Sequence, residues 1–190
     1  MNIIAIDIGN TSIRIGLFLN DKKEFIETVP GAAEDELKTV LQSAWEKIPK
    51  ISLSKEGKRD GVLVVSSVKP AWTQRLARMV KQELDEDIKL VGREIPLPIS
   101  AFVDDPDQIG TDRLVAAAAA YVVVENAAIV IDVGTAVTID LVDQHGVFQG
   151  GVIFPGFALG ARALKDHTAQ LPKVDVQRPS APYGKNTAEA

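Results

Sequence analysis

The 190-residue sequence contains no cysteine, only two histidines and no block rich in lysine or arginine. The lack of cysteine excludes disulfide bonds and cysteine-ligated zinc. Neither His145 nor His167 has a partner at metal-ligand spacing, so we expect both at the surface. With 21 basic against 26 acidic residues and a net charge of −5, the chain has no basic stripe of the kind that neutralises a nucleic-acid backbone. We therefore predict no nucleic-acid partner.

Long uninterrupted hydrophobic runs are also missing. The most apolar long segment, residues 114–133, is broken by Glu125, Asn126 and Asp132, which favours a buried helix and a buried strand over a membrane span. The first residues carry no basic region ahead of their short apolar run, as a secretory signal would. The sequence thus predicts a cytoplasmic protein with no membrane partner.

One pattern is present twice. An apolar, β-branched run ends in Asp-x-Gly at Asp7 and again at Asp132, and in each copy a small hydroxyl or amide residue and a second alternating run follow. Each copy predicts a strand, a tight turn and a strand. A single Asp-x-Gly turn is most often an ordinary hairpin, but its repetition favours two related halves with a shared function.

Both turns have the chemistry of a phosphate site. Glycine allows the backbone to approach a bound group closely, and Asn10, Thr11 and Thr135 add short donors beside exposed backbone N–H groups. The carboxylates of Asp7 and Asp132 would repel a phosphate unless a cation lay between them. The turns therefore predict bound phosphate together with Mg²⁺ or a monovalent ion.

The periodicity of the whole chain predicts an α/β fold with a mixed sheet covered by helices. In the first half the predicted elements are strands at 3–8, 13–19 and 25–29, a helix around 37–48, a strand at 61–67, a helix from residue 70 and a strand at 88–91. In the second half they are a helix from residue 111, the second hairpin, a strand at 147–154 and a helix around 158–164. We place the two halves at residues 1–110 and 111–190.

For several residues a structural role explains the sequence as well as or better than a functional one. Trp45 and Trp72 lie on the apolar faces of their helices, so we expect both to point inward. The polar residues 52–60 and the acidic run 104–107 predict solvated loops. Asp112 stands at a helix start, where a capping acid is the commonest role, although its neighbours and the other motifs favour catalysis.

Five motifs occur in an order that resembles the type III pantothenate kinases, which belong to the superfamily of acetate kinase, sugar kinases, heat-shock-70 proteins and actin. They are Asp7-x-Gly-Asn-Thr, Gly110-Thr-Asp-Arg113, Asp132-x-Gly-Thr-Ala, Gly150-Gly-Val-Ile-Phe-Pro-Gly156 and Gly184-Lys-Asn-Thr187. The resemblance spans nearly the whole chain. It implies an actin-like ATPase fold and phosphorylation of pantothenate by ATP, the first step of coenzyme A biosynthesis. It also implies Mg²⁺, a monovalent cation such as K⁺ or NH₄⁺, and a homodimer.

The same resemblance implies a role for individual residues. Asp112 corresponds to the catalytic base, Asp132 to the monovalent-cation ligand and Asp7 to a Mg²⁺ ligand. Residues in the position of ATP contacts are Asp7, Gly9, Asn10, Thr11, Arg14 and Thr135. Residues in the position of pantothenate contacts are Gly110, Thr111, Arg113 and Thr187, the last of which reaches the site from the neighbouring subunit in the family.

Two features depart from the family pattern. Val103 stands where many relatives carry a tyrosine that contacts pantothenate, which affects the expected affinity for this substrate. Relatives also continue past residues 184–187. Because Asn186 and Glu189 have the form of a helix start, we expect the second half to be incomplete at its C-terminus.

Two other functions stay open. One is a non-catalytic regulatory protein, since the family includes members described as transcriptional accessory factors. Such a protein is expected to have lost Asp112, Asp132 or Arg113, and this chain retains all three. The other is a kinase that phosphorylates a different small acceptor, such as a sugar or an acyl phosphate.

Overall fold

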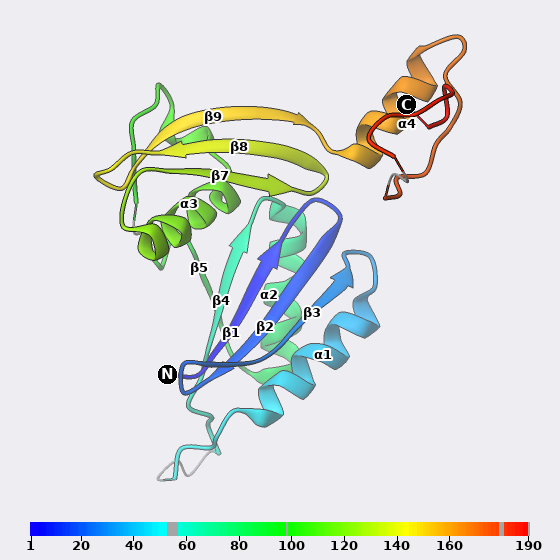
Figure 1. The fold of residues 1–190 in the computed structure, drawn as a ribbon. Coiled ribbons are helices and arrows are strands. Elements are labelled where there is room, and N and C mark those ends of the chain that lie inside the picture. The colour runs from blue at the N-terminus through cyan, green and yellow to red at the C-terminus, as the bar shows by residue number, and fades with distance from the viewer. Residues whose placement is uncertain (53–56, 98, 179–180, 190) are drawn as a thin grey trace. The chain divides into compact units, whose positions relative to one another are not determined.

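A computed structural model describes residues 1–52, 57–97, 99–178 and 181–189 (Figure 1). The chain divides into two compact units, one formed by residues 1–100 with 105–118 and the other by residues 101–104 with 119–190. Within the described ranges, no helix is both long enough and apolar enough to cross a membrane. Of the loop predicted at 52–60, residues 53–56 lie outside the described residues.

The first unit is built on a five-stranded sheet with the order β3-β2-β1-β4-β5. Its strands are β1 (Ile3–Ile8), β2 (Ser12–Leu19), β3 (Lys22–Pro30), β4 (Val62–Ser67) and β5 (Ile88–Leu90). The first three pair antiparallel, and β4 pairs parallel to both β1 and β5. The predicted mixed sheet is therefore confirmed, with β3 longer at both ends than the pattern indicated.

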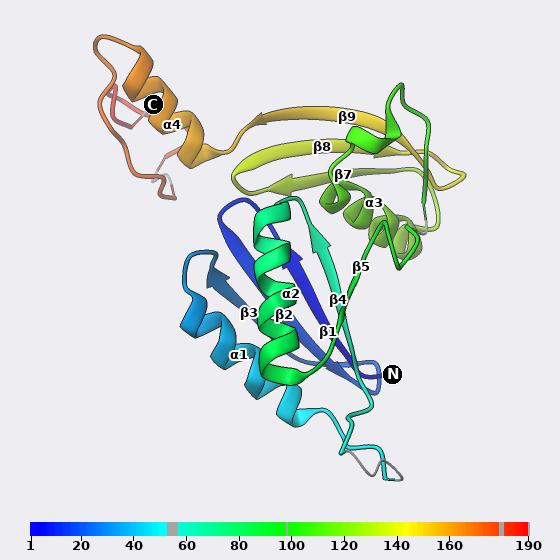
Figure 2. The same cartoon turned by 180° about the vertical axis from the view of Figure 1, so that it is seen from behind.

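Two helices, α1 (Glu34–Lys47) and α2 (Pro70–Leu84), pack on one face of this sheet. Seen from behind in Figure 2, α2 lies in front of β1 and β2. The buried cluster joins alternate residues of the strands to the apolar stripes of both helices, as the helical spacing predicted. Trp45 is in this core, whereas Trp72 is only half-buried and packs against Gly31.

The segment between the two sheets contains more structure than the sequence indicated. Its two-residue strand β6 (Ser100–Ala101) joins the second sheet beside β9, and Phe102 N donates to Phe148 O at 2.8 Å. A short 3₁₀ helix, η1 (Pro106–Gln108), follows. The residues of the acidic run at 104–107 are exposed, as predicted.

Helix α3 (Thr111–Val124) begins where the sequence predicted. Leu114, Ala117 and Ala118 are buried, while Val122–Val124 in its last turn are exposed. The predicted buried helix is therefore correct only as far as Ala118. The apolar composition of the last turn does not secure burial, because burial depends on what packs against it.

The second unit contains a four-stranded sheet with the order β6-β9-β8-β7. Its hairpin strands are β7 (Ala128–Val133), β8 (Ala136–Val142) and β9 (Val147–Pro155), all antiparallel, and helix α4 (Phe157–His167) follows. His145 lies in the β8–β9 turn and His167 at the end of α4, and both are exposed as predicted.

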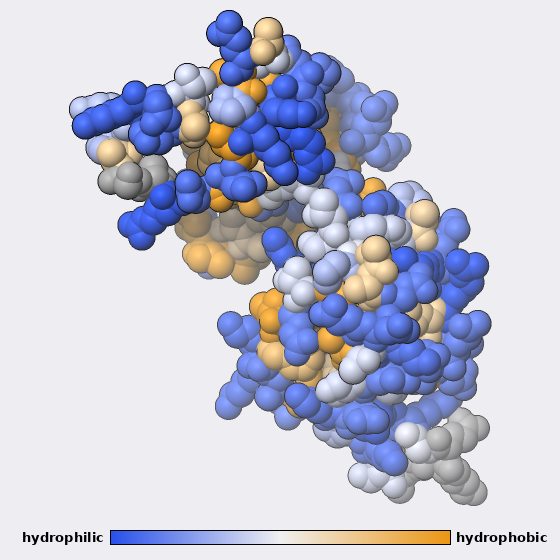
Figure 3. Space-filling model, turned by 90° about the vertical axis from the view of Figure 1, so that its right-hand side faces the viewer, coloured by the Kyte–Doolittle hydropathy of each residue, from blue (hydrophilic) through white to orange (hydrophobic). Residues whose placement is uncertain are grey.

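The prediction that β7 is a buried strand is wrong. Ile129, Ile131 and Val133 are 68%, 61% and 53% exposed. Among the described residues of this unit, no helix covers their face of the sheet in the way that α1 and α2 cover the first sheet. Hydrophobic side chains consequently reach the molecular surface, which is coloured orange where it is apolar in Figure 3.

Candidate functional site

The first turn connects β1 to β2 through residues 9–11. Gly9 N donates to Ser12 O at 3.1 Å, and Gly31 N donates to Thr11 O at 3.0 Å. Asn10 and Thr11 are exposed at the tip. The turn is thus tight, tied to the end of β3, and open to a ligand at its outer side.

A row of polar residues crosses the sheet just before this turn. Asp7 of β1 lies opposite Arg14 of β2 and level with Ser66 of β4, so all three side chains share one face. Ser66 is 9% exposed, and its hydroxyl has no hydrogen-bond partner among the described residues. The register thus pairs an acidic residue with a basic one at this end of the sheet.

The start of α3 lies at the same end of the first sheet. Val68, directly after β4, donates its N–H to Ile8 O at 3.1 Å. A Cβ at Gly110 would lie 3.8 Å from Val68 Cγ1. The structure therefore brings residues 110–113 to the end of β1 and β4 from which the first turn projects, all within the first unit.

Asp112 is exposed and bonds to its own helix. Its Oδ1 accepts the backbone N–H of Arg113 at 2.9 Å. A Cβ at Gly110 would lie too close to this same oxygen, so glycine leaves room for the carboxylate in this position. Thr111 and Arg113 are half-buried on either side of it. This bond orients the carboxylate, but it differs from an N-cap bond, because Asp112 lies inside α3 and accepts the N–H of the very next residue.

The second turn connects β7 to β8 through Gly134 and Thr135. Gly134 N donates to Ala136 O at 2.9 Å, and Gly156 N donates to Thr135 O at 2.9 Å. A Cβ at Gly156 would collide with the carbonyl oxygens of the turn, so this glycine allows the start of α4 to lie directly on it.

The two turns differ in the residue opposite the aspartate. Asp7 faces Arg14, whereas Asp132 faces Thr138 on β8. Asp132 and Thr135 are both exposed. The cross-strand position that supplies a cation in the first hairpin therefore supplies a neutral hydroxyl in the second.

The other predicted site residues lie in the second unit. Thr187 is exposed in the turn 186–189, where Asn186 Oδ1 accepts the N–H groups of Ala188 and Glu189 at 3.1 Å each. Val103 lies beside β9, with its Cγ1 3.7 Å from where a Cβ of Gly150 would be. The site residues therefore fall into two groups, with the first hairpin and residues 110–113 in one unit and Asp132, Thr135 and Thr187 in the other.

No group of three or more His, Cys, Asp or Glu residues within the described ranges could hold a metal ion by itself. Mg²⁺ in nucleotide sites usually keeps several waters and takes only one or two carboxylates in addition to phosphate oxygens. A single carboxylate such as Asp7, next to a phosphate turn, fits that donor set. Asp132 beside the hydroxyl of Thr138 fits a large monovalent ion with oxygen ligands.

Lys69 was not identified from the sequence. Its Nζ donates to Asn10 O in the first turn at 3.1 Å and lies 3.4 Å from the centre of the Trp72 ring. A cation placed just after β4, whose end adjoins the first turn, is the signal that could have revealed it.

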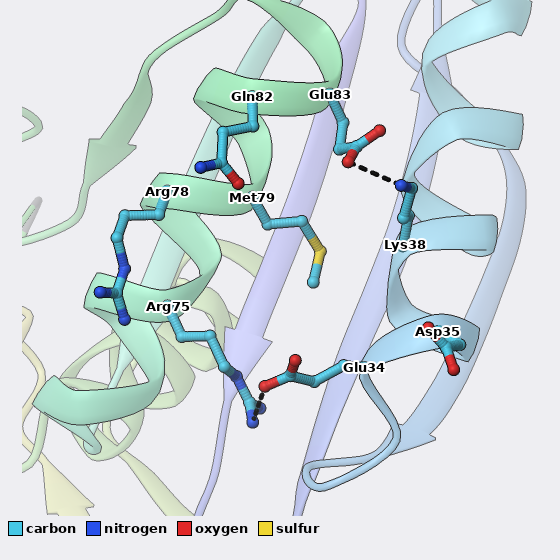
Figure 4. A pocket seen from close by; sticks show the side chains of 8 residues that line it. All are labelled: Glu34, Asp35, Lys38, Arg75, Arg78, Met79, Gln82 and Glu83. Carbon is cyan, nitrogen blue, oxygen red and sulfur yellow. Dashed lines mark hydrogen bonds and ion pairs between the residues drawn. The ribbon is translucent and has the colours of Figure 1, made fainter.

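A groove of about 360 Å³ lies between α1 and α2, but it contains none of the predicted site residues (Figure 4). Most of its lining side chains are charged, and both signs are present. The lining residues are Glu34, Asp35, Lys38, Arg75, Arg78, Met79, Gln82 and Glu83. Ion pairs between Lys38 and Glu83 at 2.6 Å and between Arg75 and Glu34 at 2.9 Å cross it. Its charges are thus largely satisfied between the helices.

A sheet that opens with three antiparallel strands, continues in parallel strands and carries a glycine turn after an aspartate belongs to the actin-like class of α/β folds. A Campylobacter jejuni structure described as a Baf family transcriptional activator has the same fold, with a TM-score of 0.51 and 19% identity over 98% of this chain and 70% of that one. The likeness at this identity concerns the fold alone.

The family follows from the sequence comparisons. The model of the type III pantothenate kinase family matches residues 3–190, and the chain belongs to this family. Relatives called type III pantothenate kinase include proteins from Dehalococcoides mccartyi, 33% identical over 99% of this chain and 72% of the relative, and from Persephonella marina, 36% identical over 99% and 73%. A Streptomyces avermitilis relative is 34% identical over 99% and 72%. The family resemblance noted from the five motifs is confirmed.

Proposed function

We propose that this protein transfers the γ-phosphoryl group of ATP to the primary hydroxyl of pantothenate, which yields 4'-phosphopantothenate in the first step of coenzyme A biosynthesis. The observation that carries the proposal is the position of Asp112. Its helix start lies at the end of the sheet from which the first phosphate turn projects. Family membership supplies the substrates.

Asp112 acts as the base. Phosphoryl transfer mainly requires positioning and charge neutralisation, with one group to accept the proton of the attacking hydroxyl. Oδ1 is held by the N–H of Arg113, so Oδ2 is the oxygen that meets the substrate hydroxyl. The proton passes to Asp112, the hydroxyl oxygen bonds to the γ-phosphorus, and the bond to the bridging oxygen breaks to release ADP.

The phosphates of ATP are bound by the first turn. Gly9, Asn10 and Thr11 supply backbone and short side-chain donors, Arg14 supplies positive charge, and Asp7 holds Mg²⁺ together with its waters. Bound there, Mg²⁺ would supply positive charge to the transferring phosphoryl group. Thr135 of the second turn is a further ATP contact, supported by its exposure and by its place in the repeated motif.

Pantothenate is bound by Gly110, Thr111 and Arg113, with the guanidinium of Arg113 suited to a carboxylate. Thr187 completes this site from the second subunit of a homodimer. Asp132 holds K⁺ or NH₄⁺, and the neutral Thr138 opposite it supports this role because no cross-strand cation offsets the carboxylate. The cytoplasm is the expected location.

Incubation of the full chain with ATP, Mg²⁺, K⁺ and pantothenate tests the proposal, with phosphopantothenate detected by mass spectrometry. We expect turnover that depends on pantothenate. ADP release with a sugar or another acceptor, but not with pantothenate, would identify a different kinase. ATP binding without turnover on any acceptor would favour a regulatory role and contradict the proposal.

A further inference from the structure

Lys69 connects helix α2 to the first phosphate turn. It is the residue just before α2, and its Nζ donates to the carbonyl of Asn10 at 3.1 Å. The same ammonium lies 3.4 Å from the centre of the Trp72 ring, one turn further along α2. A cation on an aromatic face is held by the ring quadrupole, so the Lys69 side chain has two anchors rather than one.

The carbonyl of Thr11 is the second carbonyl of the turn that is bound. Trp72 and Arg75 support it through Gly31. The Trp72 ring packs on Gly31 so closely that a Cβ there would overlap it. Arg75 donates to Glu34 (Figure 4). It also donates to Gly31 O, and its Cζ lies 5.5 Å from the ring centre of Trp72. Gly31 in turn donates its N–H to Thr11 O at 3.0 Å.

These contacts decide which way the turn presents its N–H groups. In a trans peptide unit the carbonyl and the following N–H point in opposite directions. Because Lys69 binds the carbonyl of Asn10, the N–H of Thr11 points away from Lys69. A phosphate approaching from that side meets a donor that is already oriented, without the loss of freedom that a mobile turn would suffer on binding.

We propose that Lys69 is a positioning residue for ATP, which orients the peptide unit between Asn10 and Thr11 and adds positive charge behind the phosphate turn. The inference rests on the proposed function, because the ligand is ATP phosphate. Lys69 acts through the turn, so it sets ATP affinity more than the rate of the chemical step.

The test compares Lys69→Met with two matched variants. Methionine keeps a straight apolar stem against Trp72 and removes both the charge and the donor. We expect Lys69→Met to raise the Kd for Mg-ATP about tenfold, the usual cost of one charged hydrogen bond, with kcat changed less than threefold. Lys69→Arg should restore most of the affinity. Arg78→Met, on the same helix and in the groove of Figure 4, should leave the Kd unchanged.

A second measurement does not depend on ATP. Amide hydrogen exchange at Gly9 and Gly31 reports the two backbone bonds that close the turn, and it should accelerate in Lys69→Met only. Unchanged exchange and unchanged ATP affinity would overturn the proposal, as would an equal loss in Arg78→Met. If the wild-type chain bound no ATP, the proposed function would fail, while the exchange rates would still decide whether Lys69 orders the turn.

Discussion

The two hairpins carry the same apolar pattern and differ in what covers it. In the first sheet Ile4, Ile6 and Ile8 of β1 are no more than 2% exposed, beneath α1 and α2. In the second sheet the corresponding Ile129 and Ile131 of β7 are more than half exposed. The cross-strand rows are also alike: Ile6 pairs with Ile15, and Ile131 with Ile139. Pattern thus determines the strand and its register, whereas burial is determined by helices elsewhere in the chain.

The helices that follow the two hairpins show the same difference. Helix α1 comes after β3 and buries Leu37, Leu41, Ala44 and Trp45. Helix α4 comes after β9 and, in the described chain, buries none of its residues. Four side chains that anchor one helix to its sheet therefore have no counterpart in the other, although both helices are amphipathic.

The largest predicted effect is on the free energy of unfolding, and it compares the covered face of the first sheet with the exposed face of the second. Ile6→Ala leaves a cavity in a closed core and should lower the free energy of unfolding by about 2–5 kcal/mol. Ile131→Ala, at the corresponding position, removes a largely exposed side chain and should change it by less than about 0.5 kcal/mol. Urea unfolding, read by amide exchange in β1 and β7, measures both. Equal losses would show that the second face is covered in solution.

The next effect tests the base proposed in the first unit, Asp112. Asp112→Asn keeps the size and capping ability of the side chain and removes the base, so fold and ATP affinity should survive. The rate of phosphopantothenate formation should fall by about 100-fold or more. Asp107→Asn, in the nearby exposed acidic run, is the control and should have no effect. A near wild-type rate for Asp112→Asn would leave Asp112 as a cap alone.

A smaller effect concerns the residue opposite each aspartate. With Thr138 opposite Asp132, activity should rise with K⁺ and fall when Na⁺ replaces it. Thr138→Arg would give the second hairpin the cross-strand cation of the first and should abolish the response to K⁺. Initial rates in the two salts at constant ionic strength provide the measurement. Equal wild-type rates in both salts would remove the ion assignment and leave the kinase assignment intact.

The smallest effect concerns the turns that lead into the third strand of each sheet. In the first sheet Asn20 and Asp21 form the turn with φ values of 50° and 65°. In the second, Asp143 holds the turn through the N–H groups of Val147 and His145, and the Val147 bond contributes most to keeping the pKa of Asp143 below its usual value.

A folded-state pKa below the unfolded value stabilises the turn above the unfolded pKa, near 3.8, and this contribution is lost as pH falls through the folded pKa. The protection factor of the Val147 amide, which is the exchange rate of an unstructured peptide divided by that of this amide at the same pH, should therefore fall when the pH drops below about 3.8 and stay constant above about pH 5. Asp143→Asn should remove this pH dependence. A pH-independent protection factor in the wild type would show that the carboxylate does not hold the turn.

Most of the first unit followed from the sequence because its signals are local. Period-two alternation marks the strands, the 3.6-residue apolar period marks α1, and Pro70 marks the start of α2. The two-residue strand β6 has too few residues for a period, since it exists only through its pairing with β9. The exposure of Ile129 and Ile131 was missed for a related reason. Whether an apolar side chain is buried depends on which other elements pack against it, and its own sequence pattern does not show this.

The candidate site was predictable to a similar degree. The two turns and the helix start at Asp112 have recognisable spacing, so the sequence located them. The contact from Lys69 to Asn10 joins residues 59 positions apart. The geometry behind it, in which β4 runs parallel to β1 and ends beside the turn, depends on strand order rather than on any short motif.

The uncovered strand β7 has a consequence for the behaviour of this chain in concentrated solution. It lies at the edge of its sheet, so one row of backbone N–H and C=O groups has no neighbouring strand within the described chain. An accessible edge beside alternating apolar side chains is a template for intermolecular strand pairing. Aggregation, measured by light scattering, should increase with protein concentration and with sulfate, which strengthens apolar association, and charged substitutions along β7 should improve solubility.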